Sequence, residues 1–200
     1  MSQKDVRLMQ LAYDRGFESS FNHRHGCIAV LNGKVISHGV NNQRCFSSDG
    51  LIKETWCCHA EVDAIRKLCY STKYIRGVTD IISVSKMSEL KRINHTRFNK
   101  LHKLLSKVTL YIARVPWEEE ETHHPIMSKN STPCLHCLRI LRCLGIKQVA
   151  FVTENNEFVK CRPNGINNLH ITSGYRSLSL SKKNGMLCIN DNKYVKICNK

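Results

Sequence analysis

The sequence has no long apolar run. None of its segments approaches the roughly 18–20 consecutive apolar residues that a membrane-spanning helix requires. Its first ten residues, MSQKDVRLMQ, also contain no apolar run of the length found in secretory signal peptides. We therefore expect a soluble, intracellular protein, in the simplest case a cytoplasmic one, without a membrane partner.

Acidic residues are few. The chain has 16 Asp and Glu residues against 31 Lys and Arg residues, which gives a formal net charge of +15 at pH 7. A surface with this excess attracts anions, and nucleotides and nucleic acids both qualify. The charge alone does not choose between them, so nucleic acid stays open as a partner.

Cysteine, in contrast, is abundant, with 11 residues in a chain of 200. A reducing compartment keeps most thiols free, so clustered cysteines there indicate a metal site before they indicate disulfides. The odd total also argues against a full set of internal disulfides. With 42% hydrophobic and 24% charged residues, the composition is that of an ordinary globular domain.

Hydrophobic periodicity predicts helices that alternate with strands. Asn32-Gly33 favours the tight turn of a two-residue hairpin between two β-prone runs. Pro133 is expected to open a helix that Gly145 ends. The expected helices cover residues 5–18, 57–70, 88–105 and 133–144; the expected strands cover 27–31, 34–38, 108–115, 148–153, 157–161 and a late segment near 194–197.

This order of elements packs helices against a mixed sheet. We expect an α/β fold, a three-layer α/β/α sandwich around a mixed sheet of roughly five strands. One domain is expected to cover residues 1–162, with an insert at about 71–107. Residues 163–200 are rich in Asn, Ser, Gly and Lys, and are expected to form an extension that is loosely ordered or packed on the domain.

Three residues at the starts of two predicted helices have the chemistry of a metal site. Cys134 and Cys137 are three residues apart, so both thiolates can reach one zinc ion at about 2.3 Å. A helix N-terminus also favours the thiolate form. His59, from the other helix, can add a neutral nitrogen. Three protein ligands leave one tetrahedral position open, which is typical of catalytic zinc, and we expect Zn2+ as the cofactor.

Glu61 lies two residues after His59, where a carboxylate can reach a water held by the metal. Metal-activated water beside a proton-shuttling carboxylate performs hydrolytic attack on an electron-poor carbon. A lone HxE or CxxC pattern is a weak signal, but the two together, in this order at two helix starts and between β-prone segments, are a strong one. The alternative interpretations are a structural zinc site and, for Glu61, an acid favoured by the helix dipole.

The segments HAE (59–61) and PCLHC (133–137) match the H-x-E and P-C-x-x-C signature of zinc-dependent nucleobase deaminases. Over roughly residues 5–160, without the insert, the chain resembles the zinc-dependent cytidine/deoxycytidylate deaminase superfamily. HGCIAVLNGKVISHGVNN (25–42) resembles the first hairpin of that family. STPCLHCLRILRCLGIKQVAFVT (131–153) resembles its second motif with the helix and strand that follow.

The resemblance implies a role for each matching residue. Glu61 would move protons from the zinc-bound water to the ring nitrogen and then to the leaving amine, while the water attacks C4 of a cytosine ring or C6 of an adenine. The backbone N–H of Ala60 would hold the base carbonyl. Asn41, or its neighbour Asn42, would bind the base or the sugar. Because relatives often assemble, a homo-oligomer is expected.

The resemblance determines the substrate less sharply than the metal. Residues 66–107 and 117–130 are longer than is usual in the family, and the second segment lies where these enzymes form part of the substrate pocket. The hairpin 148–161 resembles free-nucleoside enzymes. His59 stands where tetrameric cytidine deaminases usually have Cys, which resembles the deoxycytidylate and tRNA-editing branches. Deoxycytidylate (dCMP) is our first choice of substrate. The candidates for binding its phosphate are Arg24, His25 and Arg44, with His23 beside them.

Two other functions stay open. A deaminase that acts on a base within RNA or DNA would use the +15 charge and the basic helix at 88–105, although a solvated helix face explains such a run as well. An inactive deaminase fold could serve as a binding or partner subunit, against which the intact Glu61 argues. Buried thiols and an exposed loop are the simpler interpretations for the residues that could form a second metal site, Cys45, Cys57, Cys58, His123 and His124.

Overall fold

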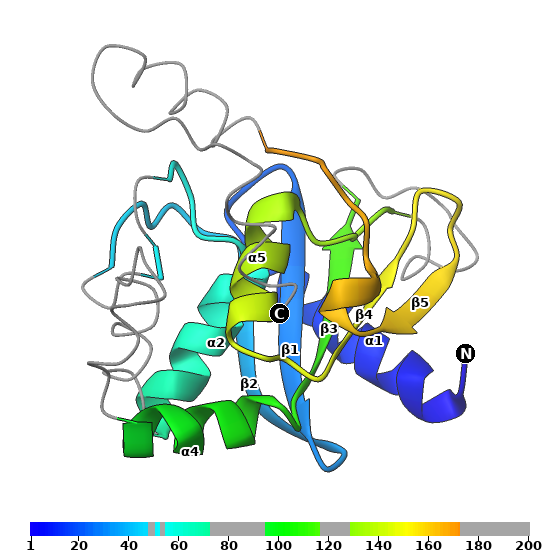
Figure 1. The fold of residues 1–200 in the computed structure, drawn as a ribbon. Coiled ribbons are helices and arrows are strands. Elements are labelled where there is room, and N and C mark those ends of the chain that lie inside the picture. Colours follow the sequence, from blue (N-terminus) through cyan, green and yellow to red (C-terminus); the bar gives the residue numbers. More distant parts are fainter. Residues whose placement is uncertain (48–50, 53–54, 73–94, 117–128, 173–200) are drawn as a thin grey trace.

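The computed structural model describes residues 1–47, 51–52, 55–72, 95–116 and 129–172. Most of the expected insert, the late strand near 194–197 and His123-His124 lie outside these residues. The elements are α1 (Gln3–Gly16), β1 (Arg24–Leu31), β2 (Lys34–Val40), α2 (Ala60–Ser71), α4 (His95–Leu105), β3 (Thr109–Val115), α5 (Leu135–Cys143), β4 (Gln148–Val152), β5 (Phe158–Cys161) and the 3-10 turn η3 (Pro163–Gly165). Figure 1 shows their arrangement.

The strands form one mixed sheet of five strands in the order β2-β1-β3-β4-β5. β1 pairs antiparallel with β2 and with β3, and β4 pairs antiparallel with β5. β3 and β4 are parallel, and α5 lies between them in the chain, because parallel neighbours require a crossover connection. The predicted antiparallel return at 157–161 is confirmed.

The predicted hairpin turn at Asn32-Gly33 is confirmed, and both residues have positive φ, 50° and 80°. The flanking strands are longer than expected. β1 begins at Arg24 rather than residue 27, and β2 ends at Val40 rather than residue 38. The reason is that β1 is hydrogen-bonded on both sides, so the ladder continues through polar residues that carry no hydrophobic pattern.

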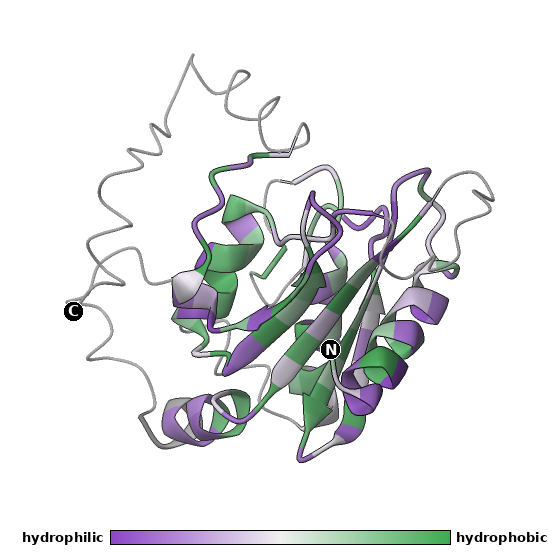
Figure 2. Cartoon of the chain, turned by 90° about the vertical axis from the view of Figure 1, so that its right-hand side faces the viewer, coloured by the Kyte–Doolittle hydropathy of each residue, from purple (hydrophilic) through white to green (hydrophobic). Residues whose placement is uncertain are grey.

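Helices cover both faces of the sheet, which confirms the three-layer α/β/α sandwich. Side chains alternate along β1, so Ile28 and Val30 pack under α1, whereas Cys27 and Ala29 pack under α2 and α5. Both faces are therefore apolar, and the central strands are continuous hydrophobic runs. Figures 1 and 2 show α1 on one side of these strands and α2, α4 and α5 on the other.

A polar cluster ties α1 to two strands of the sheet. Asp5 in the first turn of α1 accepts hydrogen bonds from the Tyr111 hydroxyl (2.6 Å) and from Lys160 Nζ (2.7 Å). Lys160 also donates to the Tyr111 hydroxyl at 2.8 Å. Tyr111 lies on β3 and Lys160 on β5, so this cluster connects three elements that are far apart in the sequence.

Residues beyond the expected domain end at 162 pack against α5. The guanidinium of Arg142 donates to the carbonyl of Ile166 at 2.6 Å, and the amide of Asn168 donates to the carbonyl of Pro133 at 2.9 Å. Ile166 itself is 7% exposed and belongs to the core. In the part of the chain that the structure describes, no helix is both long and apolar enough to cross a membrane.

Candidate metal centre

The candidate metal ligands stand at the starts of α2 and α5. His59 is the N-cap residue of α2 and Cys134 is the N-cap residue of α5, both with extended backbone. The second helix therefore begins at Leu135, two residues later than Pro133. The helix begins there because the Cys134 sulfur accepts the N–H of Cys137 at 3.5 Å. This N–H lies in the first turn, where it has no acceptor within the helix. Cys137 then follows within the first turn.

Contacts with β2 hold the start of α2 in place. Gly39 allows the helix to come close, because a Cβ at this position would lie 2.2 Å from the nitrogen of Ala64 and 2.5 Å from the carbonyl of Ala60. Asn42 and Cys58 exchange two backbone hydrogen bonds of 3.0 and 2.9 Å. These hydrogen bonds fix the backbone of Cys58 and so position His59, the next residue.

Ser131 holds the chain that leads into Cys134. It is 2% exposed, and its hydroxyl donates to the carbonyl of Ile112 (2.8 Å) and accepts the N–H of Val152 (2.9 Å). The chain before α5 is thus hydrogen-bonded to the middle of β3 and to the carboxyl end of β4. Sequence reasoning did not single out Ser131, because its function depends on two strands that become neighbours only in the fold.

The three predicted ligands come together. Nδ1 of His59 lies 3.2 Å from Sγ of Cys137 and 3.4 Å from Sγ of Cys134, and all three atoms lie within 4.8 Å of one another. Tetrahedral zinc with bonds of about 2.1 Å to nitrogen and 2.3 Å to sulfur separates its ligand atoms by about 3.5–3.8 Å. The donor set and its spacing therefore fit one zinc ion with a fourth position left for water or substrate.

The protonation of the cluster is uneven. A hydrogen bond from the Cys137 thiol holds the pKa of Cys134 well below its ordinary value, although burial acts in the opposite direction, and His59 lowers it further. The same hydrogen bond, together with burial, raises the pKa of Cys137 well above its usual range. Burial lowers the pKa of His59, but its hydrogen bonds to Cys134 and Cys57 outweigh this and raise that pKa well above the ordinary value. Without metal, one sulfur is a thiolate and the other ligands hold protons.

Glu61 is buried next to this cluster. It is 6% exposed on the first turn of α2, and its carboxylate interacts with the thiol of Cys137. Burial raises its pKa, an effect that the thiolate of Cys134 increases and His59 opposes. A buried carboxyl group with a raised pKa beside the metal ligands is suited to take up and release a proton during a reaction.

Asn41 braces the start of β1. Its side-chain Oδ1 accepts the N–H of His25 at 2.7 Å, and its Nδ2 donates to the carbonyl of His23, also at 2.7 Å. Burial is the main reason why the pKa of His25 falls to about 4, so its imidazole is neutral at pH 7. Asn42 forms a local turn, with its side chain bonded to Val40 and Arg44.

The other predicted substrate residues differ in their placement. Ala60 is fully buried at the first position of α2, where a backbone N–H has no partner within the helix. Arg24 pairs with Val115, whose side chain packs under α1, so the two strand partners project to the face opposite the metal cluster. Arg44 is exposed in the loop after β2.

Among the described residues, the group formed by His59, Cys134 and Cys137 is the one with metal-ligand spacing. No disulfide joins the described cysteines. Burial raises the pKa of Cys58 to about 12, and Cys45 is exposed, so the cysteines near His59 do not form a second site of this kind.

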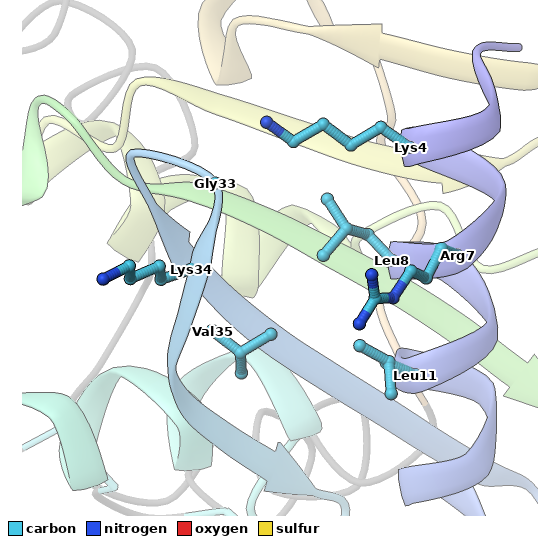
Figure 3. Close-up of a pocket in the computed structure, with 7 residues that line it drawn as sticks. All are labelled: Lys4, Arg7, Leu8, Leu11, Gly33, Lys34 and Val35. Atoms are coloured by element: carbon cyan, nitrogen blue, oxygen red, sulfur yellow. The ribbon is translucent and has the colours of Figure 1, made fainter.

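A surface hollow lies on the α1 side of the sheet, away from the metal cluster (Figure 3). Its lining combines three cationic residues with aliphatic ones. Its lining residues are Lys4, Arg7, Leu8, Leu11, Gly33, Lys34 and Val35.

Two cysteine sulfurs and one imidazole around an open position, with a buried carboxyl group beside them, are the features of a zinc-dependent hydrolytic enzyme. The family model of the cytidine and deoxycytidylate deaminase zinc-binding region matches residues 2–153, and the chain belongs to this family. The crystal structure of cytidine deaminase from Burkholderia pseudomallei is similar at 17% sequence identity and a TM-score of 0.44, and the match covers 82% of this chain and 94% of that one. No curated protein matches the sequence.

Proposed function

We propose that the protein is a hydrolytic deaminase of a cytosine-type nucleotide, with dCMP as the first candidate. The reaction replaces the exocyclic amine by a carbonyl and releases ammonia. The observation that supports this most is the burial of Glu61 beside His59, Cys134 and Cys137 where the two helix starts meet. A structural zinc site needs no carboxyl group beside its ligands, and burying such a group costs free energy.

His59, Cys134 and Cys137 would hold the zinc ion, which supplies the Lewis acidity that makes water nucleophilic at neutral pH. Glu61 takes the proton from the attacking water and passes it to the ring nitrogen next to the carbon under attack. It then delivers the second proton to the amine, which leaves as ammonia while the carbon keeps the oxygen. The backbone N–H of Ala60 would hold the carbonyl of the base. Asn41 would position the base or sugar with its second Nδ2 proton, because the first is donated to the carbonyl of His23.

A small nucleotide substrate is supported by two features of different kinds. The antiparallel β4–β5 pair is the arrangement that, by the resemblance described above, is typical of enzymes acting on free nucleosides. The net charge of +15 favours a substrate that carries a negative charge. Together these features favour a free nucleoside monophosphate.

The test is ammonia release by zinc-loaded protein from a panel of dCMP, deoxycytidine, CMP, cytidine and the corresponding adenine compounds. We expect turnover of cytosine substrates, with dCMP the best of them. Glu61→Gln should lower turnover by at least about 100-fold at unchanged zinc content, because general acid–base catalysis contributes about 100- to 10,000-fold. Equal turnover by Glu61→Gln would contradict the mechanism, and an inactive zinc-loaded parent would favour a binding or partner subunit.

The excess of basic residues supports a second candidate, a deaminase that acts on RNA or DNA. Lys100 and Lys103 on α4 are exposed cations that could contact phosphates. Salt separates the two functions, because polynucleotide binding weakens steeply with ionic strength and turnover of a monophosphate changes little. Activity on an oligonucleotide that falls by orders of magnitude between low and moderate salt would favour this candidate over dCMP.

A further inference from the structure

His25 on β1 and Arg114 on β3 are cross-strand neighbours on adjacent strands. They are partners in the antiparallel register, and such partners project to the same face. Two residues along each strand, Cys27 and Ile112 are also partners, and both pack in the core under α2 and α5. The side chains of His25 and Arg114 therefore lie on the face that carries the metal cluster.

They also lie at the same end of the sheet as the cluster. His25 is next to Gly26, whose partner Val40 is the last residue of β2. Two residues beyond Val40, Asn42 forms the backbone bridge to Cys58, and His59 follows. On the other strand, Arg114 is two residues from Ile112, whose carbonyl accepts the hydroxyl of Ser131 just before the cysteine motif.

Arg114 and His23 are joined by a hydrogen bond that fixes how their remaining N–H donors are oriented. Nη2 of Arg114 lies 2.9 Å from Nδ1 of His23. A guanidinium only donates, so Nδ1 is the acceptor, and the ring proton of neutral His23 is on Nε2, where it points away from the arginine. The carbonyl of His23 is at the same time held by Asn41. The pair is thus fixed to the end of β2 while His23 itself is exposed.

We propose that Arg114 and His23 form the anion subsite of this active site and bind the 5′-phosphate of its nucleotide substrate. This rests on the proposed function, and it names the residues that would distinguish a nucleotide from a nucleoside. A guanidinium presents several N–H donors in one plane, which matches the oxygens of a phosphate. Among the earlier candidates, Arg24 projects to the opposite face and His25 is neutral, as described above.

The test compares kcat/KM for dCMP and for deoxycytidine in Arg114→Gln, in Arg114→Lys and in the parent. Loss of a hydrogen-bonded charge should lower kcat/KM for dCMP by about 10- to 100-fold and leave that for deoxycytidine within about twofold. Arg114→Lys should fall between the parent and Arg114→Gln. The control Arg7→Gln, which removes an exposed cation on α1, should change neither value. Equal losses on both substrates in a folded variant would overturn the subsite.

A second measurement does not depend on turnover. Inorganic phosphate is titrated into the zinc-loaded protein while the imidazole proton signals of His23 are followed by NMR, with His23→Gln used to assign them. We expect a saturable shift in the parent and none in Arg114→Gln. A parent that deaminates nothing but shows this Arg114-dependent shift would refute the proposed function and support the anion subsite. An unshifted signal in a parent that deaminates dCMP would support the proposed function and refute the anion subsite.

Discussion

At the residue scale, two of the three candidate metal ligands, Cys137 and His59, carry protons that zinc must displace. The pKa values of Cys137 and His59 are both raised well above their ordinary ranges, the first by its hydrogen bond to Cys134 and by burial, the second by hydrogen bonds that outweigh burial. Both groups are therefore protonated at pH 7 in the metal-free protein. Zinc binds only a thiolate and a neutral imidazole, so its binding releases protons and weakens as pH falls.

We expect release of about two protons per zinc at pH 7, one from each of these groups. Isothermal titration calorimetry in two buffers of different ionisation enthalpy measures this number. His59→Ala is the control, and it should release about one proton fewer while binding zinc more weakly. Release of no protons, or an affinity that does not change between pH 6 and pH 8, would contradict the proposed protonation.

The site also shows which residues can be recognised from a sequence. His59, Glu61, Cys134 and Cys137 belong to short local patterns, because each helix start brings its own ligands close together in the chain. Arg114 belongs to no local pattern. It is identified only when β1 and β3 are paired in register, which places it beside His23, 91 residues away in the chain.

At the element scale, the position of α2 depends on the absence of a side chain at Gly39. Gly39→Ala would place a methyl group 2.2 Å from the nitrogen of Ala64, so the helix must move away from β2. We expect the free energy of unfolding to fall by about 1–3 kcal/mol, as overpacking usually costs. Because His59 precedes this helix directly, zinc affinity should fall as well. Urea unfolding and competition with a zinc chelator measure the two effects.

Gly165→Ala is the matched control for this prediction. A Cβ at Gly165 would have no atom within 4 Å, so unfolding and zinc affinity should stay close to those of the parent. If Gly39→Ala bound zinc as tightly as Gly165→Ala, the close packing of Gly39 on α2 would not be what positions His59.

At the scale of the whole molecule, Asp5 links α1 to β3 and β5 through Tyr111 and Lys160. Burial would raise the pKa of Asp5, but hydrogen bonds from Lys160, Tyr111 and Ser2 outweigh it and hold that pKa well below its usual range. A carboxylate with a lowered pKa stabilises the fold above its unfolded pKa of about 4, and this contribution is lost as pH falls below that value.

Asp5→Asn should therefore lower the free energy of unfolding at pH 7 by about 1–3 kcal/mol, the range for hydrogen bonds to charged groups. The difference from the parent should shrink as pH falls from about 4 towards 2, because the unfolded parent then takes up a proton at Asp5 that the folded protein does not bind. Denaturant unfolding at several pH values measures this. Asp14→Asn, at an exposed position of the same helix, should change stability by less than about 0.5 kcal/mol at any of them. A constant difference at all pH values would show that the charge of Asp5 is not the cause.

The sequence by itself determined the sandwich architecture, the hairpin turn and the three candidate metal ligands. Each of these follows from interactions between residues that are close in the chain: alternation, turn conformation and ligand spacing at a helix start. The tertiary structure alone decided how far β1 and β2 extend, that Ser131 fastens the cysteine motif, and that Arg114 faces the metal side of the sheet while Arg24 does not. These features arise from strand register and from close packing between distant segments, and neither leaves a local pattern in the chain.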